Sequence, residues 1–271
     1  MSVRTGGVRI GIFSAPMPRK YRDKAESYLQ HDYLQWIEMS GALPVVIPYN
    51  TKFLDEYLNS VNGLVWVGGA IENNETHSPE QYVKLRSVYE HAFHHATRET
   101  RRGNYYPIWG TCLGFEFLAM MGQHMHDLGR IPKIHKTHPG TLKFQGVSRL
   151  RRVFPAKLQE RLAREPVTRQ KHKRGFDPVS PRTLRMHPYL KVISVDTSDE
   201  SPRKFVNAFE YKHFPFYGTQ WHPEKPVSAL SVDVAVRLSQ FLKKECAKNR
   251  NRSPWTPPTG KIYASETVLL T

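Results

Sequence analysis

The chain has 271 residues, of which 39% are hydrophobic and five are tryptophan. This provides ample material for a core, and the length fits one large α/β domain or two small ones. No stretch is long and apolar enough to span a bilayer, which excludes a membrane helix. The two cysteines, Cys112 and Cys246, exclude a disulfide framework if Cys112 acts as a free thiol.

The formal charge of +16 at pH 7 has three interpretations. It can serve nucleic-acid binding, attract an anionic substrate, or lie on a solvated surface without any partner. The excess is concentrated in residues 149–174, which lack the interleaved aromatic residues that stack on bases. We therefore expect solvated surface here and no nucleic-acid partner, with substrate attraction and a nuclear-import signal as the alternatives.

Strand and helix patterns alternate through the first quarter of the chain. Apolar, β-branched runs favour strands, and apolar residues at helical spacing favour helices. Parallel strands need crossover connections, so this order predicts a parallel sheet with helices on both faces. The expected elements are strands at 8–13, 43–48 and 61–67, helices at 28–40 and 54–58, and a loop at 14–18.

The alternation of strands and helices continues along the chain and predicts a three-layer α/β/α fold of the flavodoxin-like type. We expect one domain over residues 1–248, because the candidate site residues are spread along it and must converge. The proline-rich residues 249–271 are expected to form a C-terminal extension. The later elements are strands at 106–109, 190–195, 205–211 and 216–221, and helices at 81–101, 115–121 and 232–248.

Cys112 lies between the expected strand at 106–109 and the expected helix at 115–121. Gly110 and Gly114 bracket it and favour a sharp turn. A helix N-terminus favours negative charge, so a thiol there loses its proton more easily. The pattern resembles the nucleophile elbow of serine hydrolases, although a buried structural cysteine would fit the same residues.

His222 and Glu224 follow the expected strand at 216–221. Residues two apart in an extended segment project to the same side, so the carboxylate can hold one imidazole nitrogen while the other faces a thiol. A nucleophile, a base and an orienting acid are the parts of a covalent acyl-transfer site. We therefore predict that Cys112, His222 and Glu224 act together.

Residues 109–116 (WGTCLGFE) and 217–225 (YGTQWHPEK) resemble the gamma-glutamyl hydrolase family of the class I glutamine amidotransferase-like superfamily. The similarity extends over residues 8–246. It implies the amidotransferase-like fold, a polyanionic poly-γ-glutamate substrate such as folylpolyglutamate, and a homodimer. Many members are lysosomal, vacuolar or secreted, whereas residues 1–7 lack the apolar run of a signal peptide. As written, the sequence favours the cytoplasm, or a start that has been trimmed.

The turn after the expected strand at 61–67 supplies Gly68 and Gly69. In open α/β sheets, ligands bind beyond the carboxyl ends of the strands, where this turn, Cys112 and His222 can meet. An amide from the glycine pair, assigned to Gly69, and that of Leu113 would then form an oxyanion hole, with Gly68 beside the substrate. Without the other two elements, a plain turn would explain the glycines equally well.

The resemblance also implies substrate-binding roles for Tyr33 and His172, for which core packing and a surface position are the respective alternatives. At the position of Glu116, glutaminases of the superfamily usually carry a glutamine that helps hold the substrate, and glutamate is the hydrolase pattern, so the resemblance implies substrate binding by Glu116. We therefore expect cleavage of γ-glutamyl peptide bonds through a thioester, with a glutaminase and a catalytically weak basic binding protein as alternatives. We expect no cofactor and no metal: the helix histidines His91, His94 and His95 resemble solvated residues.

Overall fold

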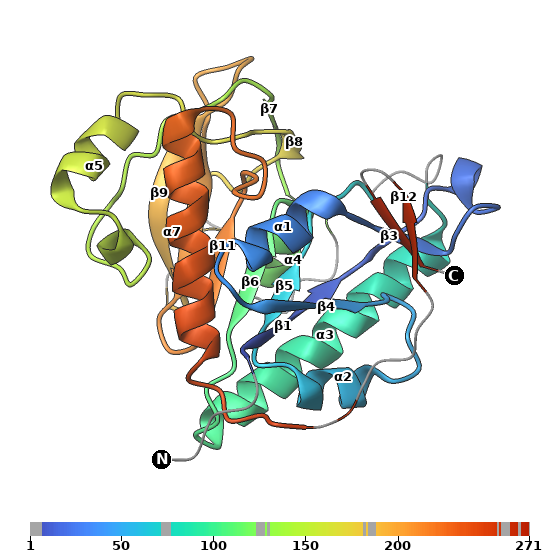
Figure 1. The fold of residues 1–271 in the computed structure, drawn as a ribbon. Coiled ribbons are helices and arrows are strands. Elements are labelled where there is room, and N and C mark those ends of the chain that lie inside the picture. Colours follow the sequence, from blue (N-terminus) through green and yellow to red (C-terminus); the bar gives the residue numbers. More distant parts are fainter. Residues whose placement is uncertain are drawn as a thin grey trace, which may run out of the picture.

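A seven-stranded mixed sheet forms the centre of the protein (Figure 1). In spatial order its strands are β4 (Leu43–Ile47), β1 (Arg9–Phe13), β5 (Leu64–Trp66), β6 (Ile108–Thr111), β11 (Phe216–Thr219), β10 (Lys204–Tyr211) and β9 (Leu190–Thr197). The structure is a computed structural model, and it describes residues 7–71, 77–122, 128, 131–180, 183, 188–253, 255, 261–264 and 267–270.

Five neighbouring strands, from β4 to β11, are parallel. β10 pairs antiparallel with β11, and the edge strand β9 pairs antiparallel with β10, as the short segment between β9 and β10 allows. The expected, mainly parallel sheet is therefore confirmed.

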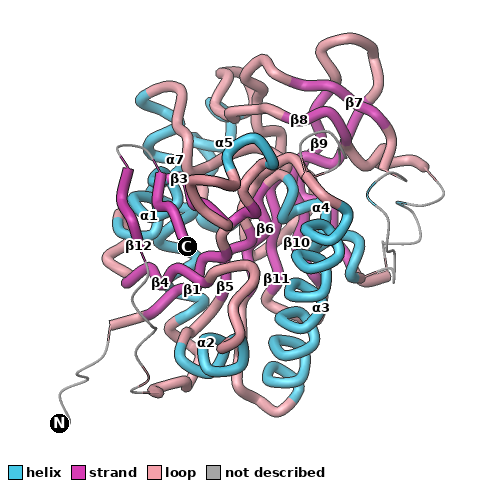
Figure 2. The backbone as a smooth tube through the Cα atoms, turned by 90° about the vertical axis from the view of Figure 1, so that its right-hand side faces the viewer, coloured by secondary structure: helices cyan, strands magenta, loops and turns pink. Residues whose placement is uncertain are grey.

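Helices cover both faces of this sheet (Figures 1 and 2). One face packs against α2, α3 and α4, and Figure 2 shows α3 and α4 side by side. The other face packs against α1, α5 and α7. The three-layer α/β/α fold is confirmed. The helix bounds are α1 (His31–Glu38), α2 (Leu54–Ser60), α3 (Pro79–Arg101), α4 (Leu113–Met121), α5 (Ala156–Leu162) and α7 (Ala229–Cys246).

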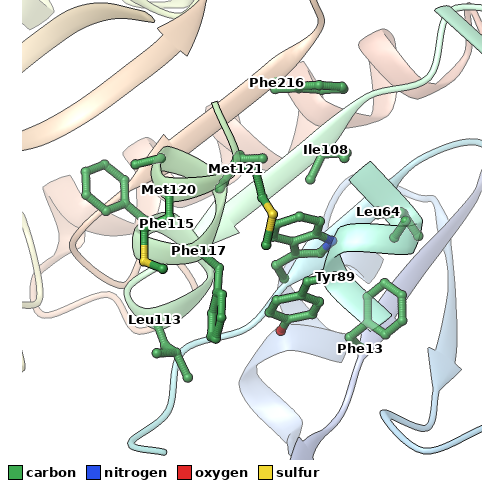
Figure 3. Packing of buried hydrophobic residues seen from close by; sticks show 14 of the residues in the cluster. Phe13, Leu64, Tyr89, Ile108, Leu113, Phe115, Phe117, Met120, Met121 and Phe216 are labelled. Atoms are coloured by element: carbon green, nitrogen blue, oxygen red, sulfur yellow. The ribbon is translucent and has the colours of Figure 1, made fainter. Parts of the chain in front are cut away.

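Alternate side chains of the central strands enter the two cores. Trp66 of β5 faces α3 and α4, whereas its neighbour Val65 faces the opposite layer. The Trp66 and Tyr89 rings stack with centroids 4.3 Å apart, and Phe117 of α4 meets Tyr89 edge-on. Figure 3 shows how Tyr89 and Phe117 bring α3 and α4 together over the sheet. No helix within the described ranges is long and apolar enough to cross a membrane.

Two segments differ from the expectation. Residues 28–30, expected in a helix, belong to strand β3 (Ser27–Gln30), and residues 15–16, expected in a loop, form β2 (Ala15–Pro16). The cause is a non-local partner: β3 pairs with β2 and with β13 (Thr267–Leu270) near the C-terminus. With β12 (Lys261–Ala264) these strands form a second, four-stranded sheet. The domain boundary after residue 248 stays a prediction.

The turn between β6 and α4 depends on close backbone packing. A Cβ atom on Gly114 would lie 2.2 Å from the carbonyl oxygen of Trp66. The amide of Gly114 also donates to the carbonyl of Val67 at 3.1 Å. The start of α4 therefore rests directly on the end of β5, which brings Cys112 next to the turn at Gly68.

We predict that Gly114→Ala lowers the free energy of unfolding by about 1–3 kcal/mol, because backbone atoms must move to admit the methyl group. Urea denaturation measures the change. Gly69→Ala is the matched control: its added Cβ would lie 3.5 Å from Leu113, an ordinary contact, so stability should stay the same. Equal stability of both variants would contradict this account of the turn.

Candidate active site

Cys112 occupies a strained turn between β6 and α4. Its φ of 51° and ψ of −106° make it the one non-glycine residue with positive φ in the described part of the chain. Such conformations cost about 1–3 kcal/mol and cluster at functional sites. Cys112 is also the N-cap of α4, so its thiol lies at the positive end of the helix dipole. The expected strand–turn–helix geometry is present.

His222 lies between Cys112 and Glu224. Its Nδ1 is 2.6 Å from the Glu224 carboxylate, and its ring also hydrogen-bonds to the thiol of Cys112. Burial alone would lower the pKa of His222, but the charges of Glu224 and Cys112 raise it to about 10. The imidazole is therefore protonated at neutral pH and faces the sulfur as a cation. The structure brings together the three side chains expected to act together.

The amides of Gly69 and Leu113 are candidates for an oxyanion hole. Among the described residues, neither N–H has a hydrogen-bond acceptor. The amide of Gly68 is different, because it donates to the hydroxyl of Tyr33 at 2.7 Å. Gly68 is thus excluded as an oxyanion donor. It must still be glycine, since a Cβ there would lie 2.7 Å from the ring of His222.

Tyr33 lies under the site and outside the cavity wall. It is 1% exposed, and burial together with the nearby Glu224 carboxylate raises its pKa well above 10. The phenol is therefore neutral: it accepts from Gly68 and can donate to Glu224. The expected contact between Tyr33 and substrate is not what this geometry indicates. Tyr33 instead ties the glycine turn to the carboxylate that orients His222.

A cavity of about 270 Å³ opens beside the thiol of Cys112. Besides His222, its wall carries three Lys or Arg side chains, two of them from the basic segment at 149–174, and the polar groups of strand β3, which the sequence did not indicate. Because β3 was expected to be helical, its contribution to a site could not be anticipated. The lining residues are Tyr28, Gln30, Gly68, Gly69, Ala70, Cys112, Arg169, Lys171, His222 and Lys225.

Glu116 and His172, both expected to bind substrate, are buried and do not belong to that wall. Glu116 accepts a hydrogen bond from Gln220 at 3.2 Å. His172 packs edge-on against Phe205, and burial lowers its pKa to about 4, so its ring is neutral. Contact with a ligand in the cavity would require movement of either side chain. Their roles stay predictions.

The basic segment at 149–174 is not simply solvated surface. Its last part crosses the site: the carbonyl of Arg169 accepts from the amide of His222 at 2.9 Å. Side chains of residues 168–173 alternate between buried and exposed positions, so Arg169 and Lys171 reach the cavity. The alternation of uncharged polar or histidine residues with cations along this stretch was the signal that could have identified them.

One of the three histidines of α3 differs from the expectation that they are solvated. His95 is 3% exposed, with its ring 5.2 Å from that of Tyr106, whereas His91 forms an exposed pair with Asp55. The side chain of His95 belongs to the layer between α3 and the sheet. Within the described residues, no three His, Cys, Asp or Glu side chains are grouped as metal ligands.

Comparison with known families identifies the chain. The profile of the Peptidase C26 family matches residues 10–224. The chain belongs to this family. Two solved structures share the fold: a protein described as a GMP synthase subunit from Thermoplasma acidophilum, and PurLQS from Thermotoga maritima. Their TM-scores are 0.53 and 0.55, at 15% identity, over 91% and 88% of this chain and 100% and 99% of theirs.

Several curated relatives of this C26 member are gamma-glutamyl hydrolases. Gamma-glutamyl hydrolase B of Dictyostelium discoideum is 28% identical over 83% of this chain and 65% of its own length. Gamma-glutamyl hydrolase of Homo sapiens is 28% identical over 83% and 72%. Gamma-glutamyl hydrolase 1 of Arabidopsis thaliana is 26% identical over 94% and 75%. The match thus spans less than two thirds of the Dictyostelium enzyme.

We predict that Glu224→Gln lowers the pKa of His222, because the neutralising charge is lost. In the folded protein this pKa is raised from 6.5 to about 10. Protonated His222 therefore stabilises the fold fully below about pH 6.5, and the contribution is lost as pH rises through 10. NMR titration of the imidazole measures the shift, and urea denaturation should show a smaller alkaline loss of stability in the variant.

The matched control is Glu200→Gln, which removes a carboxylate beside His135 instead. It should leave the titration of His222 unchanged. If Glu224→Gln also leaves it unchanged, the carboxylate does not hold the proton on the imidazole.

Proposed function

We propose that this C26 member is a cysteine hydrolase that cleaves γ-glutamyl amide bonds through a thioester. The observation that carries the proposal is the hydrogen-bonded line from Cys112 through His222 to Glu224, beside a cationic cavity. The gamma-glutamyl hydrolases among its relatives support the substrate class. A strained cysteine and a protonated histidine are also more than a purely binding protein requires.

The chemistry follows from the protonation state of the pair. His222 already holds the proton of the pair as an imidazolium, and the Cys112 thiolate attacks the γ-carbonyl carbon to form a tetrahedral oxyanion. As the C–N bond breaks, His222 gives the proton to the leaving amine, and a thioester remains on Cys112. Water then gives its proton to His222 and attacks the thioester. Collapse releases a glutamyl carboxylate and restores the thiolate beside the protonated His222.

The amides of Gly69 and Leu113 are proposed to stabilise the oxyanion. One lies on the turn after β5, and the other lies at the start of α4, directly after Cys112 in the chain. Each such donor typically contributes two to three orders of magnitude in rate, about 2.7–4 kcal/mol. The bond between Gly68 and Tyr33 fixes the first turn, so the neighbouring Gly69 amide needs little reorganisation during the reaction.

The charge of the cavity favours γ-glutamyl chains over free glutamine. Arg169, Lys171 and Lys225 line the wall. Free glutamine carries an α-ammonium group, which these cations repel. In a γ-glutamyl chain, the nitrogens of internal units are neutral amides while each unit keeps an anionic α-carboxylate. The glutaminase alternative is therefore less favoured by this site.

We predict that Cys112→Ala abolishes release of glutamate from a γ-glutamyl oligomer while circular dichroism stays that of the wild type. The substitution removes the nucleophile, so activity is lost. It removes only one sulfur atom from the packed interior, so the fold is kept. The control is Cys246→Ala, which removes the buried sulfur of α7 and should retain activity. Turnover by Cys112→Ala would refute the nucleophile. Wild-type release of ammonia from glutamine, without cleavage of the oligomer, would favour the glutaminase.

We predict that Tyr33→Phe lowers kcat by about tenfold and leaves KM nearly unchanged, because the phenol orients the site without lining the cavity. Without the phenol, the Glu224 charge acts on His222 alone, so the alkaline limb of the kcat/KM profile should move to higher pH. Tyr106→Phe is the control: it removes another buried phenol, bonded to the carbonyl of Leu58 at 2.7 Å. A general loss of stability would affect both variants but would not move the pH profile.

A further inference from the structure

Two cations in the cavity wall have no carboxylate partner. Arg169 and Lys171 both line the cavity beside Cys112, and within the described residues neither forms an ion pair. Lys225, the third cation, is different, since its ammonium lies 3.3 Å from the carboxylate of Asp32. Two unpaired cations that face one cavity beside the nucleophile point to an anionic ligand.

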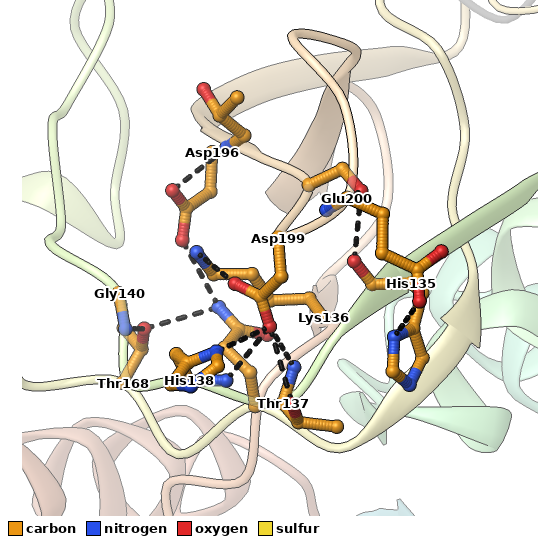
Figure 4. A network of polar contacts seen from close by, with 12 residues as sticks. His135, Lys136, Thr137, His138, Gly140, Thr168, Asp196, Asp199 and Glu200 are labelled. Atoms are coloured by element: carbon orange, nitrogen blue, oxygen red, sulfur yellow. Dashed lines mark hydrogen bonds and ion pairs between the residues drawn. The ribbon is translucent and has the colours of Figure 1, made fainter.

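The segment that carries these cations is anchored from behind. Thr168, Gln170 and His172 are buried, whereas Arg169, Lys171 and Lys173 between them are exposed. The side-chain amide of Gln170 donates to Thr168 at 3.1 Å and to Asn207 at 3.0 Å. A hydrogen bond from the amide of Gly140 to Thr168 ties the segment to the polar network shown in Figure 4.

That network holds in place the backbone of residues 168–173, which carries the exposed cations. Its centre is Asp199, which accepts from the backbone amides of Thr137 and His138 and pairs with Lys136 at 3.0 Å. Figure 4 shows Asp196 and Thr168 beside this group. The row of exposed cations is therefore presented by an ordered segment, which lowers the entropy cost of binding an extended ligand.

The position of the row relative to the thiol is defined by two backbone contacts. The Cys112 sulfur lies 3.8 Å from the carbonyl oxygen of Lys171, and the carbonyl of Arg169 accepts from the amide of His222 at 2.9 Å. Lys171 thus stands next to the reacting atoms. Arg169 also lines a second cavity of about 390 Å³ next to the first, which it shares with Lys225.

The spacing of the two cations is close to the spacing of carboxylates along a γ-linked glutamyl chain. Residues two apart in an extended segment are separated by about 6.6–6.8 Å. A γ-linked glutamyl chain has five backbone bonds per unit, so standard bond lengths place successive α-carboxylates about 6 Å apart when it is extended. In a fully extended chain, successive carboxylates project to opposite sides, because each unit has an odd number of backbone atoms. A rotation about the CH2–CH2 bond of a unit turns two successive carboxylates toward the same side, where Lys171 and Arg169 are exposed.

We propose that Lys171 and Arg169 bind two successive α-carboxylates on one side of the scissile bond, with the chain continuing toward the second cavity. This inference rests on the proposed γ-glutamyl specificity and deepens it. It makes the enzyme selective for chain length: the first carboxylate is held beside the thiol, and the next one is held by Arg169. Longer chains gain affinity until the second subsite is filled.

The experiment compares di-, tri- and tetraglutamyl γ-linked oligomers bearing the same aromatic amide at the amino end. Steady-state kinetics are measured for the wild type, Arg169→Gln, Lys171→Gln and Lys173→Gln. The last variant is the matched control, because Lys173 is exposed on the same face of the segment but does not line either cavity. Every variant removes one positive charge.

We expect kcat/KM of the wild type to rise by about twofold to fivefold when the second carboxylate is added, the size of one solvent-exposed ion pair. Arg169→Gln should lose this gain, so that its kcat/KM no longer rises when the second carboxylate is added. Lys171→Gln should raise KM for every substrate by a similar factor. Lys173→Gln should match the wild type, and added salt should weaken the chain-length effect in the wild type.

Equal effects of all three substitutions would show that only the general positive potential matters, which overturns the subsites. The subsites are equally overturned if kcat/KM does not depend on chain length in the wild type. Both outcomes leave the proposed function intact. The proposed function itself fails if the wild type cleaves none of the oligomers, so the two failures are distinguished in one set of assays.

Discussion

The buried hydrogen bond between His222 and Glu224 is the interaction on which the site depends. An imidazolium inside the protein is costly, because burial favours its neutral form. The Glu224 carboxylate and the Cys112 sulfur offset this cost, and together they raise the pKa of His222 to about 10. The carboxylate is itself buried and has the neutral phenol of Tyr33 as a second neighbour. Removing the charge of Glu224, His222 or Cys112 would leave a buried charge on a neighbouring side chain without its neutralising partner.

The parallel sheet makes such a group possible, because it gathers the ends of β5, β6 and β11 at one edge. The turns after these strands also need close contact between backbones, which a side chain at the contact would prevent. At Gly114 and Gly68, an added Cβ would collide with Trp66 and with the His222 ring, respectively. The two glycines permit backbone approach, and the strain at Cys112 is the cost of turning the chain between β6 and α4. The aromatic core around Tyr89 holds these elements in place.

Much of this arrangement was predictable from local sequence patterns, since strand and helix periods and the two motifs near Cys112 and His222 are contained in short stretches. What could not be predicted depends on distant partners. Strand β3 has helical spacing in the sequence and is extended because β13 pairs with it. Likewise, the amide of Gly68 is unavailable as an oxyanion donor because Tyr33, on α1, takes it. Burial of His95 and His172 follows from which face of each element meets a neighbour.

The positive charge of the protein is best understood through the partners of each cation. Arg149 lies in the basic segment but donates to the carbonyls of Tyr211 and Phe214 and stacks over Tyr217, so it supports the fold. Arg161 forms an exposed pair with Glu165 on the same segment. Arg169 and Lys171, only a few residues further on, have a cavity in front of them where these two have protein groups. The net charge of the protein treats these four cations alike. Their surroundings distinguish the two that contact protein groups from the two that face the cavity and are available to a ligand.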